Sequence, residues 1–179
     1  PWTPRERADR FAEFLPLLDR LLTEDAVSYE GDFYAAHEAR NVPGCVQRPR
    51  LPFAVAATGP RGLRLAARYG QAWVTTGDPK LSESGTPEQS VRALRTQAER
   101  LADACARIGR DVGALDKVLL TGFTPDRNEP LRSLDAFVDF AGRHRELGFT
   151  EIVVHWPIPD SDFATDQKVF ERIAMEAPA

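Results

Sequence analysis

The sequence predicts an α/β fold built from four consecutive strand–helix units. From residue 53 onward, short apolar segments alternate with longer segments whose apolar residues recur at helical spacing. Glycine, proline or threonine follows each short segment closely, as expected where a buried strand ends. Alternation of this kind is typical of a parallel sheet covered by helices.

A helix and an insertion precede these units. The pattern Thr3-Pro4-Arg5-Glu6 is a capping box and predicts a helix from about residue 5 to 23. The pair Gly31-Asp32, set between aromatic residues, predicts a tight turn or a small hairpin. We expect residues 36–52 to form an extended loop, because five residues there are turn formers, namely Asn41, Pro43, Gly44, Pro49 and Pro52.

The first two units are the clearest. Residues 53–57 form a short apolar run typical of a strand buried on both faces, and the helix after it ends at Gly70. The second strand is predicted over residues 72–76. Its helix begins at the capping box of Thr86 and is closed by Gly109.

The last two units complete the pattern. Strands are predicted over residues 118–123 and 151–156. A helix from Ser133 to a cap at Gly148 separates them, and a final helix carries apolar residues between Phe163 and Ile173.

Composition narrows the class of protein. The chain has 179 residues, a formal charge of −4 and 42% hydrophobic residues, which is ordinary for a globular domain. The acidic balance argues against a nucleic-acid partner, and no apolar run is long enough to span a membrane. Cys45 and Cys105 lie far apart in a cysteine-poor chain, which predicts no disulfide framework and a cytoplasmic location.

We expect one structural domain, with the helix and insertion in residues 1–52 and the four units in residues 53–179. Two architectures fit, an open doubly wound sheet or part of a (β/α)₈ barrel. A complete barrel needs about 250 residues, so length alone favours the small open domain. Strand order separates the two, because an open sheet places a later strand between earlier ones, whereas barrel strands are neighbours in sequence order.

Two strand ends are candidates for an anion site. Gly59 and Pro60 lead from the first strand into a helix whose free backbone N–H groups suit a phosphate. Thr75, Thr76 and Gly77 end the neighbouring strand, at the edge where parallel sheets bind ligands. An ordinary βα turn and threonine caps explain the same residues.

Other polar residues have simpler interpretations. His155 and Trp156 end the fourth strand, at the edge where barrel active sites open. His155 could serve as an acid–base group and Trp156 as a pocket wall, or both could be ordinary packing residues. His144, between two arginines, is expected on a solvated helix face. We expect the following arginines on a solvated helix face too, where they pair with acidic residues: Arg92, Arg95, Arg100 and Arg107. The histidines and cysteines show no metal-ligand spacing.

Three segments in order, residues 29–34, 47–56 and 62–73, resemble the bacterial luciferase-like monooxygenases. This resemblance implies the C-terminal half of a TIM barrel, strands five to eight, with FMN or the 8-hydroxy-5-deazaflavin coenzyme as cofactor. It implies that the turn after the first strand here, together with the end of the second, holds the cofactor phosphate or side chain. The implied cofactor-binding residues are Ala57, Thr58, Gly59, Pro60, Arg61, Thr75, Thr76 and Gly77. Asp78 stands where members with a phosphorylated sugar substrate carry a lysine, which argues against that substrate.

The resemblance implies an oxidoreductase that transfers a hydride or activates O₂ on a small organic substrate. The ring contacts and catalytic residues would lie mostly in a missing N-terminal half, with His155 the one candidate here and Trp156 lining the substrate pocket. The alternative is a shortened, non-catalytic flavin-binding or structural member. Because half a barrel leaves two open sheet edges, we expect a homo-oligomer or a complementing N-terminal half. A small open α/β enzyme for phosphate esters or sugars is the third hypothesis.

Overall fold

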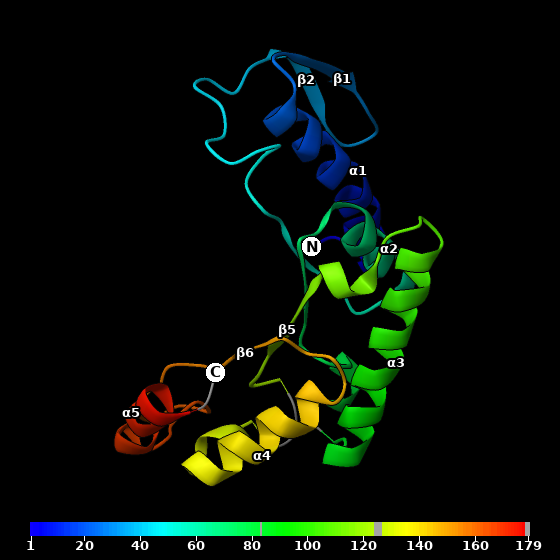
Figure 1. Cartoon of the computed structure of the whole chain (residues 1–179). Coiled ribbons are helices and arrows are strands. Elements are labelled where there is room, and N and C mark those ends of the chain that lie inside the picture. Colours follow the sequence, from blue (N-terminus) through cyan, green and yellow to red (C-terminus); the bar gives the residue numbers. More distant parts are fainter. Residues whose placement is uncertain (83, 124–126, 178–179) are drawn as a thin grey trace.

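The computed structural model describes residues 1–82, 84–123 and 127–177. Helix α1 (Pro4–Thr23) and a hairpin of β1 (Val27–Glu30) and β2 (Ala35–Ala39) form one end of the molecule. Figure 1 shows this end separated from helices α4 and α5 by the strands and by α2 and α3.

Helix α1 starts as the sequence predicts. The Thr3 hydroxyl accepts a hydrogen bond from the Glu6 N–H (3.2 Å), and the Glu6 carboxylate accepts one from the Thr3 N–H (2.7 Å). Further along α1, the Glu13 carboxylate accepts hydrogen bonds from the backbone N–H groups of Phe33 and Tyr34. These bonds fix the hairpin on the helix. The predicted loop over residues 36–52 is therefore wrong at its start, because residues 35–39 pair with β1 once the turn is held in place.

All four strand–helix units are present. Each strand ends earlier than predicted, because the residues after it turn out of the ladder toward the loop. The final helix starts later than predicted, where the Asp166 side chain caps it. The elements are β3 (Ala54–Ala56), α2 (Pro60–Tyr69), β4 (Ala72–Thr75), α3 (Pro87–Ala106), β5 (Asp116–Leu120), α4 (Leu134–Arg145), β6 (Glu151–Val153) and α5 (Gln167–Glu176), with short 3₁₀ turns at Pro79–Leu81, Val112–Ala114 and Glu129–Leu131.

The strand order decides between the two architectures. The sheet runs β3-β4-β5-β6, and every neighbouring pair is parallel. Sequential parallel neighbours are the arrangement of a barrel wall, and no later strand lies between earlier ones. The open doubly wound order is therefore wrong. The four strands form an open segment of a barrel.

The two faces of this sheet are covered unequally. Val55, Trp73 and Leu119 point to the helices and are almost completely buried. On the other face Ala54 and Ala56 are exposed, and 43% of Val153 is accessible. The prediction that the first strand is buried on both faces is therefore wrong, because Ala54 and Ala56 are exposed on the concave side.

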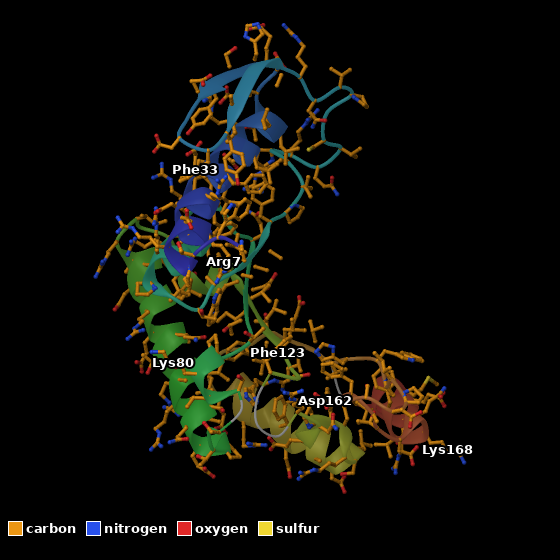
Figure 2. All side chains as sticks on the ribbon, turned by 180° about the vertical axis from the view of Figure 1, so that it is seen from behind. Arg7, Phe33, Lys80, Phe123, Asp162 and Lys168 are labelled. Atoms are coloured by element: carbon orange, nitrogen blue, oxygen red, sulfur yellow. The ribbon has the colours of Figure 1, made fainter. Side chains whose placement is uncertain are left out.

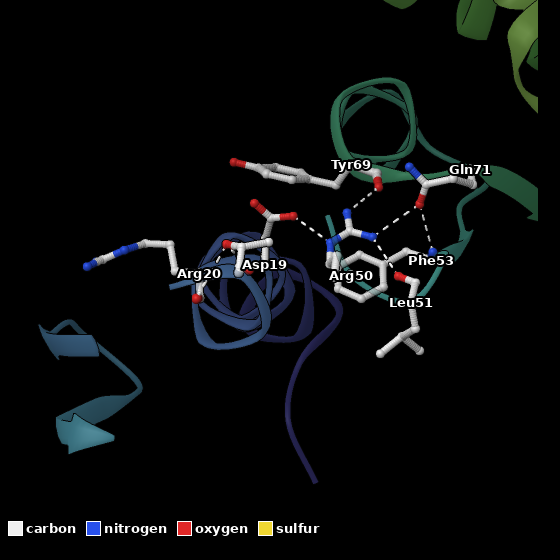
Figure 3. A network of polar contacts seen from close by, with 8 residues as sticks. Asp19, Arg20, Arg50, Leu51, Phe53, Tyr69 and Gln71 are labelled. Carbon is white, nitrogen blue, oxygen red and sulfur yellow. Dashed lines mark hydrogen bonds and ion pairs between the residues drawn. The ribbon is translucent and has the colours of Figure 1, made fainter. Parts of the chain in front are cut away.

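Arg50 joins α1 to the sheet (Figure 3). Its guanidinium donates to the Asp19 carboxylate on α1, to the Tyr69 carbonyl at the end of α2 and to the Gln71 side chain. Gln71 also accepts a hydrogen bond from the Phe53 N–H, at the entrance to β3. The network sets the position of the first barrel strand against α1.

Both cysteines are free, and burial raises the pKa of the Cys105 thiol. Among the described residues, no helix combines the length and apolar character needed to cross a membrane.

Candidate functional site

An open cleft of about 470 Å³ lies at the carboxyl ends of β3 and β4. One wall is the turn of Thr58 and Gly59 before α2, and another is the segment Asp78–Lys80 after β4. Helix α3 forms the far side with Ala93, Thr96, Gln97 and Arg100. Ligands of parallel α/β proteins bind at this edge. Of the predicted cofactor-binding residues, Thr58 and Gly59 line the cleft, whereas Thr75, Thr76 and Gly77 lie directly before its Asp78–Lys80 wall.

The start of α2 has free backbone N–H groups. Gly59 is the N-cap residue, no side chain caps it, and Pro60 takes the first helical position. The first N–H groups of an α-helix have no intrahelical carbonyl, so those of Arg61 and Gly62 are directed out of the helix end. A Cβ at Gly59 would meet nothing within 4 Å, which leaves room for a group at this end. Backbone N–H groups with the helix dipole behind them suit a phosphate.

Two predicted residues of this turn have structural partners instead. The Ala57 N–H donates to the Val74 carbonyl (3.0 Å), and the Ala57 carbonyl accepts from the Trp73 indole (2.8 Å). The Arg61 side chain forms an ion pair with Asp9 of α1. Ala57 therefore holds the turn against β4, and the Arg61 side chain is engaged with α1 rather than with the cleft.

Thr75 is turned toward the helices. Its hydroxyl donates to the Gln97 side-chain oxygen (2.6 Å) and accepts from the Gly77 N–H (3.1 Å). The Gln97 amide closes the ring by donating to the Gly77 carbonyl (3.1 Å). Gly77 adopts a φ of 86°, which favours glycine. This ring shapes the exit from β4, while the half-buried Thr76 hydroxyl bonds to no described residue.

The polar floor of the cleft carries charges of both signs. The Asp78 carboxylate accepts a hydrogen bond from the Lys80 N–H (3.0 Å) and so caps the short turn that follows. Lys80 and Arg100 supply two cationic side chains against this one carboxylate. The balance, together with the N-terminus of α2, favours an anion.

A second group lies at the carboxyl ends of β5 and β6. The His155 ring nitrogen Nε2 donates to the Thr121 carbonyl (2.9 Å), and the ring lies 4.2 Å from that of Phe163. Trp156 packs its edge on Phe170, yet 61% of it is exposed. The structure thus places both predicted residues at the edge that carries the cleft.

Sequence reasoning missed the partner of His155 in this group. Gly122 has a φ of 90°, and a Cβ there would lie 2.5 Å from the His155 ring. Phe123, the next residue, meets the same ring edge-on at 5.8 Å. A glycine within an apolar strand pattern signals close approach of another group, which identifies such a position from sequence.

His144 is not on a solvated face. Only 3% of it is accessible, and its Nδ1 lies 2.7 Å from the Phe140 carbonyl. Burial lowers the pKa of the imidazole, and neighbouring Arg143 lowers it further. The expectation is wrong because α4 turns this position toward Phe149 in the core.

The expected pairing of these arginines with acidic residues is also wrong. Across the part of the chain that the structure describes, no carboxylate oxygen lies within the 4.0 Å of an ion pair from Arg92, Arg95, Arg100 or Arg107. Arg100 and Arg107 line a second cleft of about 170 Å³ together with Arg64 of α2. The described residues hold no cluster of three or more side chains suited to a metal ion.

Comparison with known proteins agrees with this geometry. Residues 3–129 match the family of luciferase-like monooxygenases, and the chain belongs to that family. A 4-hydroxyprotoasukamycin monooxygenase from Streptomyces nodosus subsp. asukaensis is 36% identical over 149 residues, covering 79% of this chain and 37% of that protein. An F420-dependent glucose-6-phosphate dehydrogenase from Microbacterium testaceum is 32% identical over 180 residues, or 97% of this chain and 45% of that enzyme. The chain thus spans less than half the length of these relatives.

Solved structures show the same fold. An F420-dependent secondary alcohol dehydrogenase in complex with an F420-acetone adduct superposes with a TM-score of 0.65 at 13% identity, over 97% of this chain and 64% of that one. The monooxygenase RslO1 from Streptomyces bottropensis gives 0.65 at 18% identity, over 98% and 62%. With the sequential parallel strands, these similarities identify the chain as part of a luciferase-like TIM barrel whose wall is not closed.

Proposed function

We propose that this chain carries the phosphate-binding part of a flavin- or deazaflavin-dependent oxidoreductase. The supporting observation is the uncapped start of α2, which opens into the cleft that also holds Lys80 and Arg100. Relatives named as F420-dependent dehydrogenases and as a monooxygenase favour a redox role. Because these relatives include dehydrogenases and a monooxygenase, we propose FMN and the deazaflavin F420 as the two candidate cofactors.

The residues present fit a phosphate-bearing cofactor. The space beside Gly59 admits a tetrahedral anion, and the backbone N–H groups of Arg61 and Gly62 are free to donate hydrogen bonds to it. Lys80 and Arg100 add cationic donors. When bound, such a cofactor supplies hydride transfer or oxygen activation, and this chain holds and orients it.

His155, Phe123 and Trp156 form the wall that we assign to the substrate. Because the Thr121 carbonyl only accepts, His155 carries its proton on Nε2 when neutral. Its Nδ1 is then the atom that takes or returns a proton to a substrate. The exposed Trp156 ring supplies apolar surface for a small organic molecule.

The second candidate is a member that works only with further strands. The concave face exposes Ala54, Ala56 and Val153, and β3 and β6 are open edges of the sheet. Exposed apolar faces and open edges favour association with another chain segment. We infer that a second copy or a complementing N-terminal half covers this face. A monomeric sedimentation profile for the stable chain would contradict cover by a second copy.

The cofactor proposal is tested by titration of the full chain. FMN and F420 are added separately, and riboflavin, which lacks the phosphate, is the matched ligand. We expect FMN to bind at least about tenfold tighter than riboflavin, because only FMN reaches the start of α2. Lys80→Gln weakens FMN binding, whereas Lys168→Gln, at the exposed start of α5, does not (Figure 2). Absence of binding by FMN and F420 in the micromolar range overturns the proposal.

A further inference from the structure

The loops after β5 and β6 meet at the ring of His155. Thr121, the residue after β5, ties the two strand ends together, because its N–H (2.9 Å) and its hydroxyl (3.0 Å) both donate to the Val153 carbonyl. The Thr121 carbonyl accepts a hydrogen bond from Nε2 of His155 (2.9 Å). One residue therefore holds both the end of β6 and the imidazole that follows it.

The imidazole of His155 presents one edge to the loop after β5. A Cβ at Gly122 would lie 2.5 Å from Cδ2 and 2.6 Å from Nε2 of this ring, and 3.0 Å from the Phe163 ring. The Phe163 ring centroid lies 4.2 Å from that of the imidazole at an interplanar angle of 32°, so Phe163 covers one face. Nδ1 lies across the ring from the Cδ2–Nε2 edge and forms no hydrogen bond to a described residue.

Phe163 is held by contacts on both sides of it in the sequence. Directly before it, Asp162 forms an ion pair with Arg127 of the loop after β5. Directly after it, the Ala164 carbonyl accepts a hydrogen bond from the Asn128 side chain (3.4 Å). The loop after β5 therefore fixes the residues that flank this aromatic ring.

A turn within the loop after β6 also holds the backbone of Phe163. Its N–H donates to the Ser161 hydroxyl (3.1 Å), and its carbonyl accepts from the Ile158 N–H (3.2 Å). Because both backbone groups are bonded, the ring can leave His155 only by rotation of its own side chain or by opening of this turn.

We propose that Phe163 and the Arg127–Asp162 ion pair are positioning residues for His155. They keep the Cδ2–Nε2 edge of the imidazole against the end of β5, so the proton of the neutral ring stays on Nε2. Nδ1 then stays available as an acceptor for a substrate group that donates a hydrogen bond, such as a hydroxyl. This role rests on the function proposed for His155, and the positioning residues need not touch the substrate themselves.

Nitrogen NMR of the full chain, labelled in its histidine rings, tests this proposal. Spectra are recorded at about pH 9, where imidazoles are neutral. The two tautomers differ in which ring nitrogen carries the proton, and His155→Gln identifies the signals of this ring among the 3 histidines. In the unmodified chain we expect a single tautomer of His155, with the proton on Nε2.

Removing the aromatic ring over His155 should release the imidazole. In Phe163→Leu, we expect the ratio of the Nε2–H to the Nδ1–H tautomer to fall about three- to tenfold, the factor that one neutral hydrogen bond supplies. Phe163→Tyr keeps an aromatic ring and should keep the single tautomer. Phe170→Leu is the matched control and should leave the ratio unchanged, because Phe170 is half-buried like Phe163 but packs on the next residue, Trp156.

The ion pair should act through Phe163. Arg127→Gln should lower the tautomer ratio about twofold, because the pair with Asp162 is partly exposed and contributes little. In the Phe163→Leu background the same substitution should change nothing further, since the group that it positions is already gone. Circular dichroism and melting temperature verify that each variant is folded.

Both tautomers of His155 in the unmodified chain, or a single tautomer that survives Phe163→Leu, overturn the proposal. So does an equal change in Phe170→Leu, because the effect is then not specific to the ring over His155. If Phe163→Leu does not fold, an unchanged ratio in Arg127→Gln overturns the proposal. Failure of the flavin titration with a single tautomer counts against the proposed function alone. Flavin binding with mixed tautomers counts against the positioning residues alone.

Discussion

The Nε of Arg50 donates a hydrogen bond to Oδ1 of Asp19 at 2.6 Å, across 31 positions of sequence. The Arg50 side chain is 5% exposed and that of Asp19 is 31% exposed. The guanidinium also stacks on the Phe53 ring at 3.4 Å. This pair therefore joins α1 to the strand that begins the barrel segment, and burial shields the guanidinium from solvent that could replace its partners.

Replacing Arg50 should destabilise the chain strongly. Arg50→Gln leaves the Asp19 carboxylate and the Tyr69 carbonyl without their donor, and we expect the free energy of unfolding to fall by about 2–3 kcal/mol. Arg50→Lys should recover only part of this loss, because an ammonium group lacks the planar, paired N–H donors of the guanidinium. Urea denaturation measures the change. Arg20→Gln is the control, since its pair with Glu24 is exposed and contributes little.

Local signals explain what the sequence predicts well. The capping boxes at Thr3 and Thr86 depend on residues three positions apart, and both form as predicted. The strand–helix alternation from residue 53 likewise depends on short-range periodicity, and four units result. The barrel assignment came from the resemblance to the luciferase-like family rather than from these local patterns, and the sequential strands confirm it.

Contacts between distant segments explain what the sequence misses. His144 looks solvated because its chain neighbours are arginines, yet its environment is set by Phe149 from the next loop. Thr75 looks available for a ligand until α3 brings Gln97 against it. An apolar strand pattern cannot predict the exposed concave face, because it shows that the residues are apolar but not which side of the sheet is covered.

Gly122 should not tolerate a side chain. In Gly122→Ala, the methyl group meets the His155 ring and the backbone keeps an unfavourable φ of 90°. Gly109→Ala provides the control, because its φ is 69° but nothing lies within 4 Å of the added carbon. We expect about 1–2 kcal/mol of destabilisation at Gly109 from the backbone alone, and about 1–3 kcal/mol more at Gly122. Equal melting temperatures for the two variants would contradict the close approach of His155.

His144 should make the chain less stable in acid. Its pKa in the folded state lies below the ordinary 6.5, mainly because burial disfavours the imidazolium. The unfolded chain therefore takes up the proton first, so the contribution is complete above pH 6.5 and is lost as the pH falls toward the folded-state pKa. Urea midpoints measured between about pH 7.5 and 5 should fall for the unmodified chain.

The variant His144→Leu should lower stability at neutral pH and flatten this acid dependence, because no imidazole is left to protonate. His37→Gln is the matched control, since His37 is exposed on β2. If the urea midpoint of His144→Leu falls with decreasing pH as steeply as that of the unmodified chain, other groups cause the pH dependence.

Neighbouring threonines at the end of β4 should respond differently to the same substitution. Thr75→Val leaves the Gly77 N–H and the Gln97 oxygen without partners in a buried site, so the free energy of unfolding should fall by about 1–3 kcal/mol. Thr76→Val breaks no hydrogen bond to a described residue and should change stability by less than about 0.5 kcal/mol. If Thr76 contacts the cofactor phosphate or side chain as its position in the family implies, Thr76→Val weakens FMN binding severalfold at unchanged stability. The same loss of FMN affinity in both variants, after correction for the unfolded fraction, would show that the shape of the turn rather than the Thr76 hydroxyl holds the ligand.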